Sequence, residues 1–145
     1  MKKRSVIIGA LVSLLPLGGP LVISTGAALT STALMLSASE NVKADSVEFY
    51  TKSGFAKFQL DDYSGAIDDF NKAIEINPSN DYAYVTRGLA KFYLDDYLGA
   101  IDDFNKAIEI NPSAGDEVVY DNRAYAKFQL DDYLGAIDDF AKAIE

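Results

Sequence analysis

Residues 57–79 read KFQLDDYSGAIDDFNKAIEINPS, and residues 91–113 read KFYLDDYLGAIDDFNKAIEINPS. The two stretches begin 34 residues apart and differ at two positions only. A third copy, KFQLDDYLGAIDDFAKAIE, fills residues 127–145 and begins 36 residues after the second, which places a longer connection near residues 114–116. Repetition at such a period predicts a repeat architecture, in which each copy is one structural unit that buries its apolar face against the next.

Each copy has the apolar spacing of an amphipathic helix. In the first copy this face consists of Ala66, Ile67, Phe70, Ala73 and Ile74. These residues recur as on one side of a helix with about 3.6 residues per turn. Asp62 is placed to cap the start of the helix, and Asn77, which precedes a proline, is placed to end it. With an earlier helix over about residues 47–60, each unit is predicted to be a helix-turn-helix hairpin.

This pattern resembles the tetratricopeptide repeat, whose signature places an aromatic residue, a glycine, an alanine, a phenylalanine and a proline at fixed spacing. The aromatic slot holds Tyr50, Tyr84 and Tyr120, and the glycine slot holds Gly54, Gly88 and Ala124. The later slots hold Ala66, Ala100 and Ala136, then Phe70, Phe104 and Phe140, then Pro78 and Pro112. The resemblance implies an all-α solenoid of three stacked hairpins within residues 45–145, at about 47–80, 81–114 and 117–145.

The resemblance also implies a function. Members of this family are non-enzymatic scaffolds whose first helices line a concave groove for a peptide or a partner helix. The second helices of the three copies are nearly identical, whereas the first helices, VEFYTKSGFA, DYAYVTRGLA and EVVYDNRAYA, differ. Ligand contacts are therefore expected from the first helices: Thr51, Lys52, Phe55, Gln59, Val85, Thr86, Leu89, Tyr93, Asp121, Asn122, Tyr125 and Gln129. The alternative is drift after duplication, with Phe55, Leu89 and Tyr125 packing between units.

The expected ligand is a protein or peptide with apolar or aromatic anchors. The groove would offer Phe55, Val85, Leu89, Tyr93 and Tyr125. Some members of the family hold the acidic C-termini of chaperones with a clamp of Lys, Asn and Arg side chains, but the matching slots here hold Thr51, Phe55, Thr86, Val118 and Asn122. Only Asn122 and the displaced Lys52 suit a carboxylate, so binding of a chaperone tail is not expected.

Composition argues against several functional classes. The chain carries 13 Lys and Arg against 22 Asp and Glu, a net charge of -9, and the acidic excess lies in residues 45–145. Such a surface repels phosphate, which argues against nucleic-acid binding. The chain has no Cys and no His, so it lacks a thiol nucleophile, the commonest acid/base group and the commonest transition-metal ligand. We expect neither an enzyme nor a cofactor.

Paired aspartates recur in register in the three copies. They are Asp61, Asp62, Asp68, Asp69, Asp95, Asp96, Asp102, Asp103, Asp131, Asp132, Asp138 and Asp139. We interpret the first pair of each copy as favourable at the positive end of the following helix, and the second pair as a solvated outer face. A basic partner docking there is the alternative. The spacing does not converge enough oxygens for a calcium site, so no metal is expected.

Basic residues recur at two positions of the first helices. Arg87 and Arg123 stand where the family usually has leucine. We expect their guanidinium groups to reach an aspartate of a neighbouring unit. Lys57, Lys91 and Lys127 are expected to be paired similarly.

Residues 1–44 have the features of a targeting segment. Met-Lys-Lys-Arg is followed by an uncharged stretch from Ser5 to Ser39. A basic start, an apolar region and small residues before Asp45 are typical of a secretory signal, with cleavage expected after Ala44. The alternative is an uncleaved membrane anchor within residues 6–38. Both interpretations place the acidic repeats across the cytoplasmic membrane, either free in the periplasm or a lumen or held at the membrane.

The third copy ends at Glu145 without the Asn-Pro terminator. Solenoids need covered ends, so Ile137, Phe140 and Ile144 are expected to leave an apolar strip exposed. Self-association through this strip, as a structural subunit, is the second functional hypothesis. A marginal array or a shortened reading frame is the other explanation.

Overall fold

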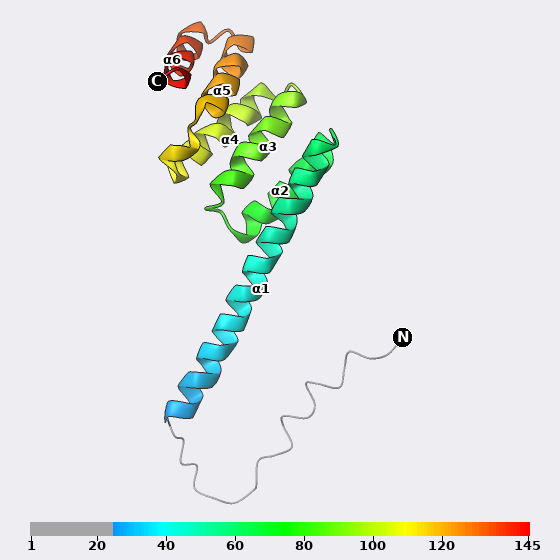
Figure 1. Ribbon diagram of the computed structural model, residues 1–145, viewed down its shortest axis with the longest axis vertical. Coiled ribbons are helices and arrows are strands. Elements are labelled where there is room, and N and C mark those ends of the chain that lie inside the picture. The colour runs from blue at the N-terminus through cyan, green and yellow to red at the C-terminus, as the bar shows by residue number, and fades with distance from the viewer. Residues whose placement is uncertain (1–24) are drawn as a thin grey trace, which may run out of the picture. The chain divides into compact units, whose positions relative to one another are not determined.

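The computed structural model describes residues 25–145, with side chains from residue 35 onward. This part of the chain contains six α-helices and no strand, namely α1 (Thr25–Gln59), α2 (Tyr63–Ile76), α3 (Asp81–Tyr93), α4 (Tyr97–Ile110), α5 (Glu117–Gln129) and α6 (Tyr133–Ala143) (Figure 1). A short 3-10 helix, Pro112–Ala114, precedes α5. The predicted all-α fold and the longer connection before the third copy are confirmed.

Residues 38–145 form one compact unit, while residues 25–37 belong to a separate one. Within residues 38–145, α3 pairs with α4 and α5 pairs with α6, and α3 also contacts α5. Helix α1 lies against α2 where Gly54 faces the ring of Phe70. Phe55 of α1 lies near Tyr82 of α3, with ring centroids 6.3 Å apart. The second helices α2, α4 and α6 make no comparable contact with one another among the described residues. The row of first helices, α1, α3 and α5, is therefore the inner side of the stack.

The first helix begins earlier than its apolar spacing predicts. The expected range was about residues 47–60, but α1 is continuous from Thr25 to Gln59. Residues 25–46 contain no proline and many alanines and leucines, which favour a helix, so nothing in the sequence delays its start to residue 47. The expected cleavage point after Ala44 lies inside α1. Residues 1–24, which hold most of the expected signal or anchor, lie outside the described residues.

None of the helices described in residues 25–145 is both long enough and apolar enough to cross a membrane.

The turns and caps follow the repeated Asp-Asp-Tyr motif. The Asp62 side chain accepts a hydrogen bond from Gly65 N at 3.0 Å, and α2 ends at Asn77, as predicted. Asp96 and Asp132 cap α4 and α6 in the same way. The residue before each cap has a positive φ of 59° at Asp61, 62° at Asp95 and 64° at Asp131. Aspartate tolerates this left-handed conformation better than most residues.

The core is a column of alanines and phenylalanines between the hairpins. Phe70 and Phe104 are fully buried. They require small residues on the facing first helix, because a Cβ added at Gly88 would lie 2.8 Å from Phe104 Cε1. In the third hairpin Ala124 replaces this glycine, and Phe140 is 43% exposed. The third copy thus repeats the sequence of the second helix without the same packing of its phenylalanine.

Replacement of the buried ring tests this core. Phe104→Ala should lower the free energy of unfolding of the full chain by about 3–5 kcal/mol, because it removes a large apolar side chain and leaves a cavity. Leu98→Ala on the same helix is the control, because Leu98 is 67% exposed and its loss should change stability by no more than about 0.5 kcal/mol. Urea unfolding followed by circular dichroism measures both. Equal effects would contradict the assignment of Phe104 to the core.

Candidate functional site

The first helices place the predicted ligand-contacting residues along the inner row, but their side chains differ in availability. Phe55 is 38% exposed, Tyr93 55% and Tyr125 47%. Gln59 and Gln129 are also exposed. These five side chains can meet a ligand without any change in the packing of the repeats.

Three of the predicted residues in α3 belong to the packing instead. Val85 and Leu89 pack against the buried cluster of Ala100, Phe104 and Val119. Thr86 is 4% exposed, and its hydroxyl donates to Tyr82 O at 2.9 Å. Thr86 therefore offers no surface to a ligand. Leu89 packs between units, as the alternative interpretation of these residues expects. Phe55 and Tyr125, in contrast, keep exposed ring surface.

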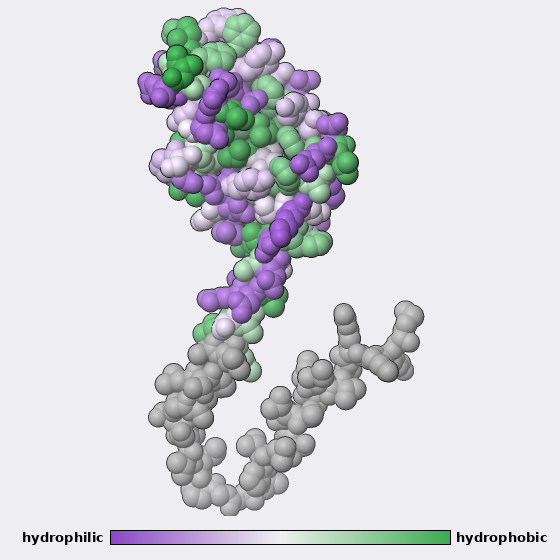
Figure 2. All heavy atoms as spheres, viewed as in Figure 1, coloured by the Kyte–Doolittle hydropathy of each residue, from purple (hydrophilic) through white to green (hydrophobic). Residues whose placement is uncertain are grey.

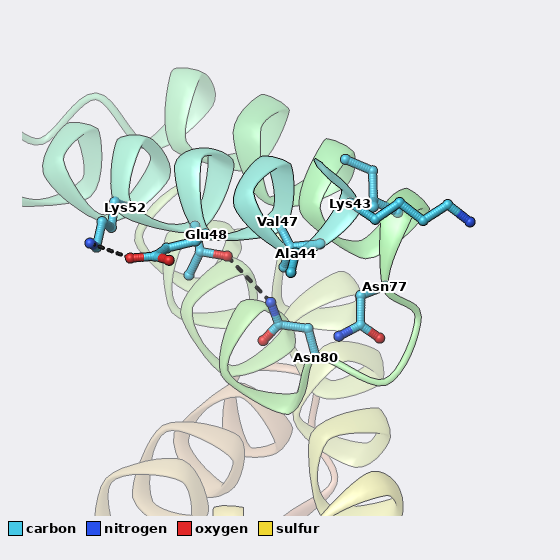
Figure 3. Close-up of a pocket in the computed structure, with 9 residues that line it drawn as sticks. Lys43, Ala44, Val47, Glu48, Lys52, Asn77 and Asn80 are labelled. Carbon is cyan, nitrogen blue, oxygen red and sulfur yellow. Dashed lines mark hydrogen bonds and ion pairs between the residues drawn. The ribbon is translucent and has the colours of Figure 1, made fainter. Parts of the chain in front are cut away.

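A cavity of about 580 Å³ lies between α1 and the connection from α2 to α3, and we call it the α1 cavity (Figure 3). Its lining residues are Lys43, Ala44, Val47, Glu48, Thr51, Lys52, Ile76, Asn77 and Asn80. Asn80 Nδ2 donates to Thr51 Oγ1 at 3.3 Å. Lys52 Nζ lies 2.5 Å from Glu48 Oε1, and this hydrogen bond and the lysine charge hold the pKa of Glu48 below its ordinary value. Two predicted residues, Thr51 and Lys52, thus share a cavity but already have partners.

A second cavity of about 610 Å³ lies beside α5, and we call it the α5 cavity. Its lining residues are Phe92, Tyr93, Asp95, Tyr97, Asp121, Asn122, Tyr125 and Phe140. Four predicted residues from two different copies meet here: Tyr93, Asp121, Asn122 and Tyr125. The Asn122 amide donates to Val118 O at 2.8 Å, which leaves its side-chain oxygen for other partners.

Sequence reasoning missed several lining residues of the α5 cavity. Phe92, Asp95 and Tyr97 belong to the part of the repeat that is the same in every copy, so the search for differences between copies passed over them. The recurrence of Phe58, Phe92 and Phe128 with Tyr63, Tyr97 and Tyr133 was the signal that could have found them. Each phenylalanine packs edge-on against the tyrosine five residues later, with ring centroids 5.4–5.7 Å apart.

The second aspartate pair is not the solvated outer face that we expected. Asp69, Asp103 and Asp139 are buried, at 5%, 3% and 0% exposure, while Asp68, Asp102 and Asp138 face the solvent or lie at the surface. The reason is helical rotation: Asp69 lies three residues after Ala66 and four before Ala73, on the buried face.

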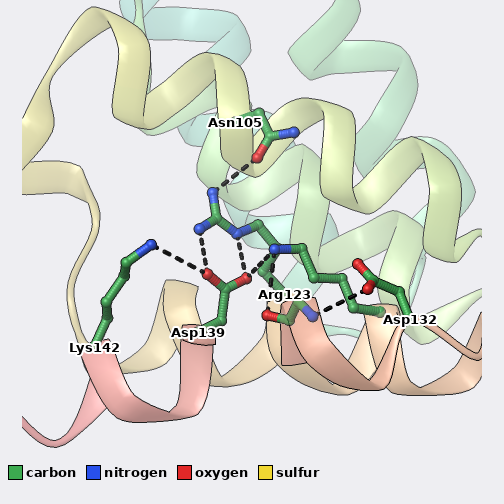
Figure 4. Close-up of polar contacts among 7 residues, drawn as sticks. Asn105, Arg123, Asp132, Asp139 and Lys142 are labelled. Atoms are coloured by element: carbon green, nitrogen blue, oxygen red, sulfur yellow. Dashed lines mark hydrogen bonds and ion pairs between the residues drawn. The ribbon is translucent and has the colours of Figure 1, made fainter. Parts of the chain in front are cut away.

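The buried aspartates bind the recurring basic residues, and Figure 4 shows Asp139 of the third hairpin with Arg123. Arg123 reaches both oxygens of Asp139, through Nε at 2.7 Å and Nη2 at 2.5 Å, and Lys127 Nζ lies 2.7 Å from Asp139 Oδ2. Arg87 and Lys91 hold Asp103, and Lys57 holds Asp69. Pairing of these arginines and lysines with aspartates is as predicted. The predicted location of the aspartates was wrong, because each arginine and each lysine meets the buried aspartate of its own hairpin and not that of a neighbouring unit.

The neighbouring hairpin supplies an asparagine to each arginine. Arg87 Nη1 donates to Asn71 Oδ1 at 2.7 Å, and Arg123 Nη1 donates to Asn105 Oδ1 at 2.8 Å. Each guanidinium thus joins the two helices of its own hairpin and also the preceding hairpin. We call this series of contacts the arginine ladder.

Burial and ion pairing act in opposite directions on these carboxyl groups. Burial raises the pKa of Asp139, but the hydrogen bonds and charges of Arg123 and Lys127 outweigh it, and the pKa lies below its ordinary value. The pKa of Asp69 is lowered by the same balance, with burial opposed by hydrogen bonds from Lys57 and Ser53. A lowered pKa stabilises the folded state above the ordinary pKa of the carboxyl group, and this stabilisation is lost as pH falls through the lower, folded-state value.

Removal of one buried charge tests this account. Asp139→Asn should cost about 3–5 kcal/mol of unfolding free energy at neutral pH, because Arg123 and Lys127 lose their counter-charge. The variant should also lose less stability than the wild type when the pH is lowered below about 4. Asp138→Asn, the exposed neighbour, is the control and should leave stability at neutral pH nearly unchanged. Equal urea midpoints for the two variants would contradict the burial of this ion pair.

In residues 25–145, no group of three or more Asp, Glu, His or Cys side chains is arranged to hold a metal ion.

Two family models match the chain. A model described as TPR repeat matches residues 54–95, and one described as Tetratricopeptide repeat matches residues 82–113. No curated protein matches the sequence.

Solved structures resemble the chain more extensively. The Arabidopsis OM64 TPR domain is 25% identical, with 70% of this chain and 83% of that chain covered and a TM-score of 0.66. The crystal structure of MamA is 30% identical, with 68% of this chain and 56% of that chain covered and a TM-score of 0.62. The first TPR of Spaghetti (RPAP3), bound to the HSP90 peptide SRMEEVD, is 26% identical, with 69% of this chain and 78% of that chain covered and a TM-score of 0.64.

Proposed function

Residues 54–113 contain tetratricopeptide repeats, and we propose from this premise that the chain is a non-enzymatic scaffold that binds a peptide or a partner protein along its inner row of first helices. The tetratricopeptide fold is typically an interaction module. The observation that carries the proposal is the exposure of Phe55, Tyr93 and Tyr125 on that row. Large aromatic side chains with free surface are the residues that most often anchor a partner.

The comparison with peptide-bound structures supports the mode of binding. The similar RPAP3 domain is bound to a chaperone peptide. By analogy, we place the ligand of this chain on the inner row. We do not expect the ligand of this chain to be acidic as that peptide is. Lys52 is paired with Glu48, and the positions that correspond to the chaperone-binding clamp hold no Lys or Arg.

Self-assembly through the third hairpin is the alternative function. Ile137, Phe140 and Ile144 are 63%, 43% and 88% exposed, and an apolar group lies at the end of the molecule that holds α6 (Figure 2). This exposure favours a contact there. We rank it below groove binding because the arginine ladder has no counterpart at this end, as Ala141 stands where Asn71 and Asn105 accept an arginine.

Selected peptides can test the proposed site on the full chain in mild detergent. Peptides isolated from a random displayed library should bind Phe55→Ala/Tyr125→Ala at least tenfold more weakly, because truncation of anchor residues typically costs about 2 kcal/mol or more. Leu98→Ala/Leu134→Ala is the matched control, since both leucines are exposed on second helices. Calorimetric titration measures the affinities. If only the Leu98→Ala/Leu134→Ala variant lost binding, the ligand would lie on the outer face, and the proposal would be wrong.

We also propose that the repeats act outside the cytoplasm, on the basis of the basic start and the uncharged stretch from Ser5 to Ser39. Cleavage after Ala44 would remove Lys43 and Ala44 from the lining of the α1 cavity. The processed and unprocessed forms would therefore differ at one end of the inner row.

Intact mass of the protein from its native cells tests the processing. We expect a soluble exported species that begins at Asp45. A full-length species found only in the membrane fraction would instead identify residues 6–38 as an anchor, and a full-length soluble species in the cytoplasm would contradict export.

A further inference from the structure

The walls of the α5 cavity combine aromatic rings with carboxylates. Phe92 lies at the centre of the rings, with centroids 5.8 Å from Tyr93, 5.7 Å from Tyr97 and 5.6 Å from Tyr125. Tyr93 and Tyr125 keep about half of their surface exposed, at 55% and 47%. The packing therefore fixes several rings around one cavity while leaving ring surface free for a ligand.

Three tyrosines elsewhere in the repeats already hold a cation. Lys72 lies over Tyr50, Arg87 over Tyr84 and Arg123 over Tyr120, at 5.2–5.3 Å from the ring centroids. Within the described residues, no Lys or Arg lies in this way over Tyr93, Tyr97 or Tyr125. The fold thus uses cation–π contacts repeatedly. One face of Tyr93 is stacked on Tyr63, with ring centroids 5.0 Å apart, so a ligand cation can use only the other face of this ring, together with Tyr125.

The two carboxylates of the cavity come from different copies. Asp95 Oδ1 accepts the Tyr97 hydroxyl at 2.7 Å, which fixes the position of the carboxylate. Asp121 is exposed on α5. No described ion pair involves Asp95 or Asp121, and no lysine or arginine lines the cavity.

The nearby cations are held inside the hairpins. Arg87 and Lys91 bind Asp103, while Arg123 and Lys127 bind Asp139. The cavity is consequently aromatic and negatively charged, which suits a positively charged side chain. A cation over an aromatic ring within about 6 Å of the centroid is attracted by about 0.5–2 kcal/mol, depending on its desolvation.

We propose that the α5 cavity recognises an arginine side chain of the partner peptide, through the face of Tyr93 that is not stacked on Tyr63, the ring of Tyr125 and the carboxylates of Asp95 and Asp121. Arginine suits both parts of the cavity, because its planar guanidinium stacks on aromatic rings and donates several hydrogen bonds to carboxylates. This inference rests on the proposed function, and it replaces the expectation of purely apolar or aromatic anchors with an arginine beside them.

Three blocked hexapeptides probe the cavity: GLYRLG, the same peptide with citrulline in place of arginine, and the same peptide with glutamate. Citrulline keeps the shape of arginine but not its charge. Calorimetric titration of the full chain should show GLYRLG binding about tenfold more tightly than the citrulline peptide, which corresponds to about 1.4 kcal/mol. The glutamate peptide should bind more weakly still, and the preference for arginine should shrink at high salt.

A matched pair of double variants locates the effect. Asp95→Asn/Asp121→Asn should abolish the preference for arginine over citrulline, with about a tenfold loss of affinity for GLYRLG. Asp61→Asn/Asp131→Asn removes the same charge outside the cavity. Asp61 and Asp131 have the positive φ of Asp95 and accept the same tyrosine hydrogen bond, so this control should bind GLYRLG as the wild type does.

Other outcomes would overturn the inference. They are a citrulline or glutamate peptide that binds as tightly as GLYRLG, equal losses in the two double variants, or no binding of GLYRLG at all. The scaffold function would survive each of these results if library peptides still depended on Phe55 and Tyr125. It would fail together with the inference only if those peptides did not depend on the inner row.

Discussion

A buried carboxylate inside each hairpin is the constraint on which the stacking of the repeats depends. Taking a charge out of water costs several kcal/mol, and the cost is offset only when the partners have good geometry. In the second hairpin Arg87 contacts both oxygens of Asp103, and Lys91 adds a further contact from the next turn of the same helix. The carboxylate therefore fixes the register of the two helices. Arg87 also donates a hydrogen bond to Asn71 of the preceding hairpin. The guanidinium that the carboxylate holds in place therefore also sets how the two hairpins stack.

The charge distribution of the inner row follows from this use of the basic residues. The chain has few cations, 13 Lys and Arg against 22 Asp and Glu, and five of those in the first helices are bound to the buried aspartates. The turn aspartates and Asp121 remain at the surface without such partners among the described ion pairs. The walls of the α5 cavity are thus acidic because the hairpin interior uses the nearby cations, and a ligand there meets carboxylates beside aromatic rings.

The repeated sequence predicted the secondary structure well because its signals are local. The caps at Asp62 and Asn77 and the helical spacing each depend on a few neighbouring residues. The burial of Asp69 was not predicted, because Asp68 and Asp69 are chemically identical neighbours and their different surroundings arise from the facing helix. Its spacing to Ala66 and Ala73 does carry the information. The cavities were harder to foresee, because Tyr93 and Tyr125 are 32 residues apart and meet only through the stacking of two copies.

The arginine ladder also differs at the two ends of the repeat series. Where Arg87 and Arg123 stand, the first copy has Ser53, whose hydroxyl donates to Asp69 at 2.6 Å and is too short to reach a preceding hairpin. Where Asn71 and Asn105 accept an arginine, the third copy has Ala141, which cannot accept one. Two chains stacked head to tail would bring Ser53 and Ala141 together and would lack the polar contact that joins the hairpins within one chain. The apolar surface of α6 would then have to be covered by a different kind of contact. The arginine ladder, which joins neighbouring hairpins within one chain, therefore cannot make the stacking of two chains specific.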